Sequence, residues 1–211
     1  MEKVPIHIEK RIFDVVVTLF LIIILSPFIL LVILGMLLES VFIPSSQGSI
    51  FYTEIRVSQG RHFKFYKFRI FKEKFLKETL REKGWIATKD LEETKGSMTF
   101  TGKVLKQIYM DELPQVINVL KGDMSLVGPR PTNIPTYEKN LREGKFSRFL
   151  IRAGITGYFQ AHKGSELWAN QNQLDMGYIE FCRNNPGWKV VLYDAKILLI
   201  TVLAVLRAEG L

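Results

Sequence analysis

One uncharged apolar segment near the N-terminus limits what this chain can fold into. Residues 15–38 are twenty-four consecutive residues without a charged side chain. About 20 apolar residues are enough for a helix to cross a bilayer, so the simplest interpretation is an ordinary transmembrane anchor. A cleavable signal peptide is disfavoured, because the apolar run is long and no A-x-A-like cleavage site follows it.

A proline interrupts this apolar segment at its centre. Pro27 follows Ser26, and proline removes one backbone hydrogen bond and opposes the preceding helical turn. Residues 15–26 would rise only about 18 Å as a helix, a little over half of the hydrocarbon thickness. We therefore predict that residues 1–45 form a re-entrant membrane hairpin, a helix-break-helix unit broken at Ser26-Pro27.

The distribution of charge supports the hairpin. Residues 1–50 carry three basic and four acidic side chains, so the remaining residues carry 26 of the 29 basic and 17 of the 21 acidic ones. Lys3, Lys10 and Arg11 precede the apolar run, and the positive-inside rule places them in the cytoplasm. A straight span would export the basic part of the chain, whereas a hairpin keeps it beside anionic head groups. We expect a monotopic protein on the cytoplasmic face of a membrane.

Composition narrows the class of the remaining chain. A single cysteine excludes a disulfide framework and a multi-cysteine zinc site, and three scattered histidines argue against a histidine-rich metal centre. We predict that residues 46–211 form one compact cytoplasmic catalytic domain, mostly α with a few short strands (α+β), with interfacial amphipathic helices. The expected elements are a strand at 50–55, a strand or surface patch at 61–71, an exposed helix at 72–83, a loop at 84–98, helices at 103–109 and about 113–122, an ordered turn at 123–131, a helix at 136–152 and an apolar helix at 189–207, which is either buried or interfacial.

Paired carboxylates are the strongest candidate for chemistry. Asp111 and Glu112 stand just before the helix predicted at 113–122, where the helix dipole would keep a carboxylate ionised and available as a nucleophile or metal ligand. An ordinary helix N-cap is the alternative. Downstream, Arg130 is held between Pro129 and Pro131, which suits a guanidinium for bidentate phosphate binding. A rigid surface turn would explain the same three residues.

Other charged residues have a functional and a structural interpretation each. Lys67 and Arg69 form a cationic pair among aromatic residues, a pattern found in single-stranded nucleic acid binding and also on solvated strand faces. Asp175 and Asp194 have apolar or aromatic neighbours and suit either magnesium ligands or structural carboxylates. The helix predicted at 136–152 carries a basic stripe, expected to face head groups or solvent: Lys139, Arg142, Lys145, Arg148 and Arg152.

Several segments together resemble the bacterial sugar transferases, the small monotopic polyprenyl-phosphate phosphoglycosyl transferases. The apolar run follows KRIFD at 10–14, and RVSQGRHFKFYKFR occupies 56–69. DELPQVINVLKGDMSLVGPRP at 111–131 matches the family's signature nearly letter for letter. RAGITGYFQ at 152–160 and LDMGY at 174–178 are similar to its later motifs. The resemblance covers almost the whole chain.

The resemblance implies an activity. Members transfer a phosphosugar from a UDP-sugar to polyprenyl phosphate at the cytoplasmic face of the bacterial inner membrane, release UMP and use Mg²⁺. It is the first membrane step of glycoconjugate assembly, with the phospholipid bilayer as a further partner. We expect no nucleic acid partner, and the apolar C-terminal segment could pair with another copy to form a homodimer. The implied roles are a nucleophile that forms an aspartyl-phosphosugar (Asp111), its assistant (Glu112), phosphate binders (Arg130, Lys67 and Arg69) and magnesium ligands (Asp111, Glu112 and Asp175).

Three positions depart from the family pattern. Ser58 stands where glycine is usual, Ala153 replaces proline, and Lys106 occupies a position that is more often arginine. None of them removes an implied catalytic group. The spacing from Asp175 to Asp194 is longer than usual, so Asp194 is not assigned to the site.

A second hypothesis needs no catalysis. A membrane-tethered module could use its basic surface to bind anionic lipid or nucleic acid. Replacing Asp111 by Asn would leave such a module intact, whereas the enzyme would lose turnover. A phosphate-backbone binder would also weaken steeply with salt.

Overall fold

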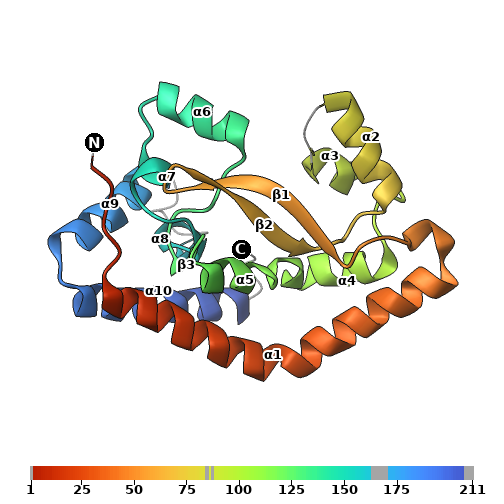
Figure 1. The fold of residues 1–211 in the computed structure, drawn as a ribbon, viewed down its shortest axis with the longest axis horizontal. Helices are drawn as coiled ribbons and strands as arrows, with labels where there is room; N and C mark the ends of the chain where they lie inside the picture. The colour runs from red at the N-terminus through yellow and green to blue at the C-terminus, as the bar shows by residue number, and fades with distance from the viewer. Residues whose placement is uncertain (1, 84–85, 87, 163–170, 207–211) are drawn as a thin grey trace. The chain divides into compact units, whose positions relative to one another are not determined.

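A computed structural model describes residues 2–83, 86, 88–162 and 171–206 (Figure 1). The chain divides into two compact units. Unit 1 comprises Met1–Ile22, Glu54–Phe65 and Gln115–Leu211, and unit 2 comprises Ile23–Thr53 and Tyr66–Pro114. Helices dominate both units, and the described strands form two two-stranded sheets. The mostly helical fold with a few short strands is therefore confirmed.

The apolar segment lies in one long helix, α1 (Ile8–Phe42, 35 residues). Within the described residues it is the one helix long and apolar enough to cross a membrane. The predicted interruption at Ser26-Pro27 is wrong as a statement about secondary structure, because the helix continues through both residues. Pro27 cannot donate to the Ile23 carbonyl, but the Ser26 hydroxyl donates to that carbonyl at 2.8 Å and replaces the bond. The re-entrant path through a bilayer stays a prediction.

Strands β1 (Phe51–Ser58) and β2 (Arg61–Phe68) form a hairpin. Both turn residues have positive φ, 49° at Gln59 and 71° at Gly60. Two-residue hairpin turns of this kind match the twist of the strands they join. The strand alternative for 61–71 is thus confirmed over most of its length, and the first strand is longer than predicted.

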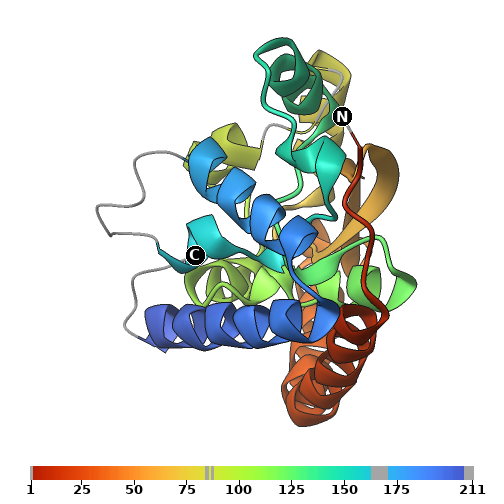
Figure 2. The same cartoon turned by 90° about the vertical axis from the view of Figure 1, so that its left-hand side faces the viewer.

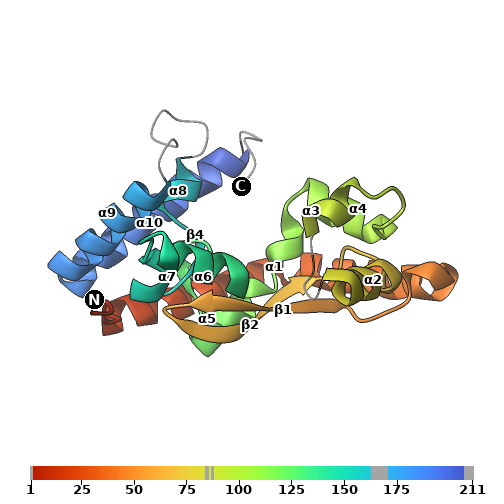
Figure 3. The same ribbon diagram turned by 90° about the horizontal axis from the view of Figure 1, so that it is seen from above.

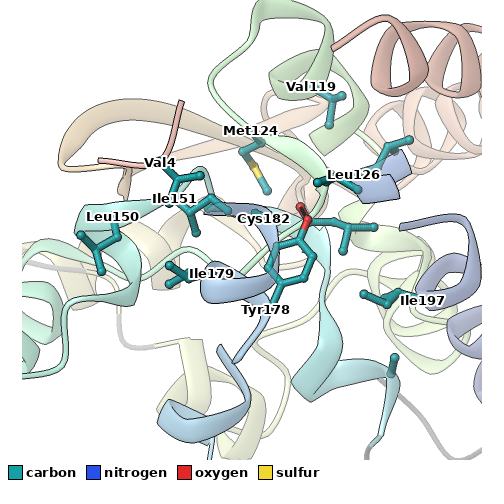
Figure 4. Packing of buried hydrophobic residues seen from close by; sticks show 14 of the residues in the cluster. Val4, Val119, Met124, Leu126, Leu150, Ile151, Tyr178, Ile179, Cys182 and Ile197 are labelled. Carbon is teal, nitrogen blue, oxygen red and sulfur yellow. Dashed lines mark hydrogen bonds between the residues drawn. The ribbon is translucent and has the colours of Figure 1, made fainter. Parts of the chain in front are cut away.

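Unit 1 is built on a short parallel sheet. β3 (Ser125–Val127) follows α5 (Gln115–Lys121) and pairs with β4 (Gly154–Thr156), with Ser125 opposite Gly154. Helix α8 (Tyr158–Ala161) contacts both α9 (Gln171–Asn184) and α10 (Gly187–Leu206), as Figure 2 shows. The core beneath them is apolar and closely packed (Figure 4), and includes Val119, Met124, Leu126, Leu150, Ile179 and Ile197.

The helix predicted at 136–152 is two helices. α6 (Ile134–Arg142) and α7 (Ser147–Leu150) are separated by Gly144, whose φ of 75° favours glycine and ends the first helix. The continuous basic stripe is therefore wrong. Arg148, in particular, is buried.

The C-terminal apolar segment is a helix that is buried along one face, and its interfacial position stays a prediction. Within α10, Val190 and Ile197 are buried, whereas Trp188, Leu192 and Leu199 are exposed. One face of the helix therefore packs on unit 1. The other face has the composition of an interfacial helix.

Unit 2 groups three short helices, α2 (Glu73–Lys83), α3 (Thr88–Glu93) and α4 (Phe100–Gln107), as Figure 3 shows. The helix predicted at 72–83 is confirmed. The loop predicted at 84–98 is wrong over 88–93, because the buried Leu91 packs into the apolar core of this unit as part of a helix. Residues 84, 85 and 87 lie outside the described residues. Two 3₁₀ turns complete the unit, η1 (Pro44–Ser46) and η2 (Met110–Glu112).

Candidate active site

The carboxylate pair lies at the end of a rigidly held helix. Glu39 accepts hydrogen bonds from the backbone N–H groups of Phe100 (2.7 Å) and Thr101 (2.8 Å), the first residues of α4. The hydroxyl of Thr99 accepts from a third amide in the same turn. These contacts satisfy donors that a helix N-terminus leaves unpaired. The other end of α4 leads directly to the η2 turn.

Backbone strain marks the entry into that turn. Tyr109 has a φ of 57° and a ψ of 25°, the left-handed region that a non-glycine residue seldom adopts. Asp111 and Glu112 follow inside η2, and α5 begins only at Gln115. Asp111 thus precedes the helix, as predicted, but the helix begins at Gln115 rather than at about 113, and the 3₁₀ turn positions the carboxylate.

Lys67 joins the two carboxylates. Its Nζ atom is 2.7 Å from Glu112 Oε1 and 3.7 Å from Asp111 Oδ2. Lys67 comes from β2, so the hairpin and the η2 turn together build the cluster. Asp111 is 4% exposed, whereas Lys67 and Glu112 keep part of their surface accessible. A buried anion beside an accessible cation suits chemistry on a phosphate.

Burial reverses the predicted electrostatics of Asp111. Desolvation raises the pKa of this carboxyl above its ordinary value, while the charge of Lys67 opposes the shift. We expected a helix dipole to lower this pKa. Lys106 also contributes a favourable charge. Burial opposes the charge of Lys106, but its ion pair with Glu92 at 2.8 Å raises the Lys106 pKa overall.

Arg69 holds the chain rather than facing the cluster. It is buried, and its guanidinium donates to the backbone carbonyls of Ser49 (2.6 Å), Phe71 (2.8 Å) and Ser46 (2.8 Å). These bonds fix the segment that links α1 to the hairpin. Its phosphate-binding role stays a prediction.

The carboxylates of unit 2 are the kind of ligand that magnesium prefers, but two of them are too few to hold the ion alone. Mg²⁺ prefers hard oxygen ligands and is commonly held by one or two carboxylates together with substrate phosphates and water. Asp111 and Glu112 supply two such groups. Across the described residues, no three His, Cys, Asp or Glu side chains are grouped as a metal site. The residues therefore fit an ion that substrate phosphates help to bind.

The remaining predicted residues belong to unit 1. Asp175 is buried, and its Oδ2 is 2.9 Å from Arg148 NH1, an ion pair whose geometry falls short of a hydrogen bond. Burial raises the pKa of Asp175 to about 6, against the effect of Arg148. Arg130 is exposed, and its carbonyl accepts from Arg148 Nε at 3.1 Å.

Two aspartates of unit 1 make contacts that were not predicted from the sequence. Asp194 accepts from Tyr178 Oη at 2.8 Å and forms a buried ion pair with Lys10, which supports the structural alternative for this aspartate. Asp14, one turn after Lys10, accepts from Ser125 Oγ at 2.8 Å. The spacing of Lys10 and Asp14 along a helix was the only signal in the sequence, and it does not reveal distant partners.

Comparisons with known proteins agree with these motifs. The family model described as bacterial sugar transferase matches residues 6–208. The uncharacterized sugar transferase EpsL of Bacillus subtilis (strain 168) is 34% identical over 97% of this chain and 90% of its own length. The exopolysaccharide production protein ExoY of Sinorhizobium fredii is 32% identical over 96% of this chain and 88% of its length. The UDP-glucose:undecaprenyl-phosphate glucose-1-phosphate transferase of Klebsiella pneumoniae is 31% identical over 92% of this chain and 39% of its own length. The chain belongs to the bacterial sugar transferase family.

Proposed function

We propose that this protein transfers a sugar-1-phosphate from a UDP-sugar to undecaprenyl phosphate and releases UMP, through a covalent aspartyl intermediate. Family membership makes it a polyprenyl-phosphate sugar-1-phosphate transferase, and the Klebsiella relative carries undecaprenyl phosphate in its name. The cluster of Asp111, Glu112 and Lys67 is the observation that carries the mechanism.

In the first step, an Asp111 carboxylate oxygen attacks the phosphorus that carries the sugar. The bond from this phosphorus to the bridging oxygen breaks, and the electron pair leaves with UMP. The products are UMP and an acyl phosphate that joins Asp111 to the sugar. An anionic carboxylate approaches an anionic phosphate here, so a cation must offset the repulsion. Lys67, 3.7 Å from Asp111 Oδ2, is placed to do so.

In the second step, a phosphate oxygen of the lipid attacks the same phosphorus. The bond to Asp111 breaks, the carboxylate is regenerated, and a polyprenyl diphosphate sugar forms. Where the lipid phosphate carries a proton, Glu112 can accept it, because this carboxylate is adjacent and less buried than Asp111. The raised pKa of Asp111 makes it a better nucleophile, provided that it is ionised.

Magnesium would be held by Asp111 and Glu112 with the help of substrate phosphates. When bound, the ion supplies positive charge that polarises a phosphoryl oxygen. Arg130 is proposed to bind a phosphate group of a substrate, the role that the family resemblance implies for it. The exposed apolar surface of α1 supports attachment to the membrane, where the lipid substrate lies, and we propose a monotopic arrangement at the cytoplasmic face of the bacterial inner membrane.

The test measures UMP release from a panel of UDP-sugars by detergent-solubilised protein with magnesium and undecaprenyl phosphate. Wild type should release UMP from at least one sugar, and Asp111→Asn should not. Asp90→Asn is the matched control, because it makes the same change on an exposed residue of the same unit.

The covalent intermediate has its own readout. Without undecaprenyl phosphate, the intact mass of the wild-type protein should increase by one sugar phosphate, and that of Asp111→Asn should not. Full activity in Asp111→Asn would refute the nucleophile. Neither release nor adduct with any sugar would favour the membrane-tethered binding module.

A further inference from the structure

A cavity of about 480 Å³ in unit 1 has a strongly polar, cationic wall. Arg56, Arg130, Lys145 and Arg148 line it, and no acidic side chain is among its described lining residues. Three of these cations form ion pairs with acidic residues that are not among the lining residues. Arg56 pairs with Glu54 at 2.6 Å, Lys145 with Glu143 at 2.5 Å and Arg148 with Asp175 at 2.9 Å. The Arg148–Asp175 pair is buried, so the fold fixes the position of this cation.

Two helix N-termini meet the same cavity. Asn133, the N-cap of α6, and Thr136 in its first turn line it, as do Gln171 and Asn172 at the start of α9. Helix N-termini present N–H groups and a partial positive charge, which favour phosphate. The cavity therefore attracts an anion by its cationic side chains, and the dipoles of two helices add to that attraction.

Side-chain amides in the wall suit a polar ligand. Asn140, Gln171 and Asn172 line the cavity, and a side-chain amide can both donate and accept hydrogen bonds. Such a wall suits a ligand that also donates and accepts. A simple anion would accept hydrogen bonds but donate none.

The size and chemistry of the cavity select the class of ligand. Its volume lies within the 300–1,000 Å³ that small-molecule sites typically have, and is far larger than one phosphate group needs. Pro131 is the single apolar residue among the described lining residues, so the wall does not suit an isoprenoid tail. A nucleoside phosphate combines an anionic group with a base that donates and accepts hydrogen bonds.

We propose that this cavity binds a uridine phosphate, and that Arg56, Lys145, Thr132 and Asn172 are binding residues alongside Arg130. The proposal rests on the proposed function, because a UDP-sugar supplies the nucleotide. It assigns Arg148 and Asp175 a positioning role, in which the buried aspartate holds one cation of the wall.

Two neighbouring lysines provide a matched test. Lys139 and Lys145 both pair with Glu143, but only Lys145 lines the cavity. The dissociation constant of UMP is measured by titration calorimetry on the full chain in detergent, without undecaprenyl phosphate. Lys145→Gln should weaken UMP binding about tenfold, the loss of one charged hydrogen bond. Thr132→Val should weaken it about fivefold, and Lys139→Gln should change it less than about twofold. Thermal unfolding of each variant reports that it is folded.

The outcomes separate this proposal from the proposed function. Equal UMP affinity in Lys145→Gln, Thr132→Val and wild type would overturn the cavity assignment, even where UMP release from UDP-sugars continues. UMP that binds no tighter than inorganic phosphate would also overturn it, because the site would then recognise only an anion. UMP binding that depends on Lys145 and Thr132 supports the cavity, even in a protein that fails to turn over any UDP-sugar tested.

Discussion

Removing the hydroxyl of Ser58 tests how two departures from the family pattern depend on each other. Ser58 is 4% exposed, and its Oγ donates to the Asp123 carbonyl at 2.6 Å and accepts from the Ala153 N–H at 3.0 Å. That N–H exists only because Ala153 stands where the family usually has proline. A glycine at 58, the usual residue, would leave the N–H buried without a partner. The serine and the alanine are therefore expected to be coupled.

The magnitude follows from the two bonds. Ser58→Ala leaves one buried N–H and one partly buried carbonyl unpaired, and an unpaired buried group costs about 1–3 kcal/mol. Partial relaxation of the site limits the sum, so we expect a loss of about 2–4 kcal/mol in the free energy of unfolding. Ala153→Pro removes the donor. It should therefore cost about 1–2 kcal/mol less in the Ser58→Ala background than in wild type.

Urea unfolding followed by tryptophan fluorescence, with wild type and both single and double variants, measures this coupling. The slope of the transition should stay constant across the four proteins, so that midpoints report stability. Additive losses, within about 0.5 kcal/mol, would refute the reasoning, because independent sites behave in that way. Ser58→Thr, which keeps the hydroxyl, is the control for the volume of the side chain.

Three further predictions address the site and its supports. Lys67→Gln removes the charge that opposes the raised pKa of Asp111, so the acidic limb of the pH–rate profile of UMP release should move to higher pH, and an unchanged limb would contradict the ion pair. Glu39→Gln should lower UMP release severalfold, because α4 loses charged acceptors for two N-terminal amides; a thermal shift without loss of activity would limit Glu39 to stability. Asp175 has a folded pKa of about 6, above its ordinary value of 3.8, so the folded state binds the proton more tightly than the unfolded state. Its contribution to stability is therefore greatest at low pH and falls by at most about 3 kcal/mol as pH rises from about 4 to 6. Urea midpoints across this range should show the fall in wild type and lack it in Asp175→Asn, whose loss of the Arg148 partner lowers stability at every pH.

Local patterns in the sequence were sufficient for much of the fold. The apolar run predicted α1, and the i,i+4 spacing of opposite charges predicted α2. Each of these signals is local, because the residues that form it lie close together in the sequence. The 136–152 prediction failed at Gly144, where a positive φ outweighed a periodic basic pattern. The loop predicted at 84–98 failed for the opposite reason. The segment is mostly polar, but the burial of Leu91 in the apolar core accompanies a short helix there.

The sequence predicted which residues form the site, but it gave the wrong direction for the pKa shift of Asp111. Asp111, Glu112 and Lys67 were singled out, and the structure brings them together although Lys67 is more than 40 positions away from them. The direction of the Asp111 pKa depends on burial, which no local spacing reveals. Arg69 was assigned to phosphate from its neighbours, but its guanidinium is surrounded by backbone carbonyls.

The buried ion pair between Lys10 and Asp194 constrains the order in which the protein can assemble during synthesis. The two residues are 184 positions apart, and at about 5–20 residues per second the second is made about 10–40 s after the first. Throughout that interval Lys10 lacks this carboxylate, while the apolar residues that follow it have already left the ribosome. The membrane attachment proposed for α1 therefore has time to precede closure of the ion pair, and the arrival of α10 then fixes the N-terminal segment in place.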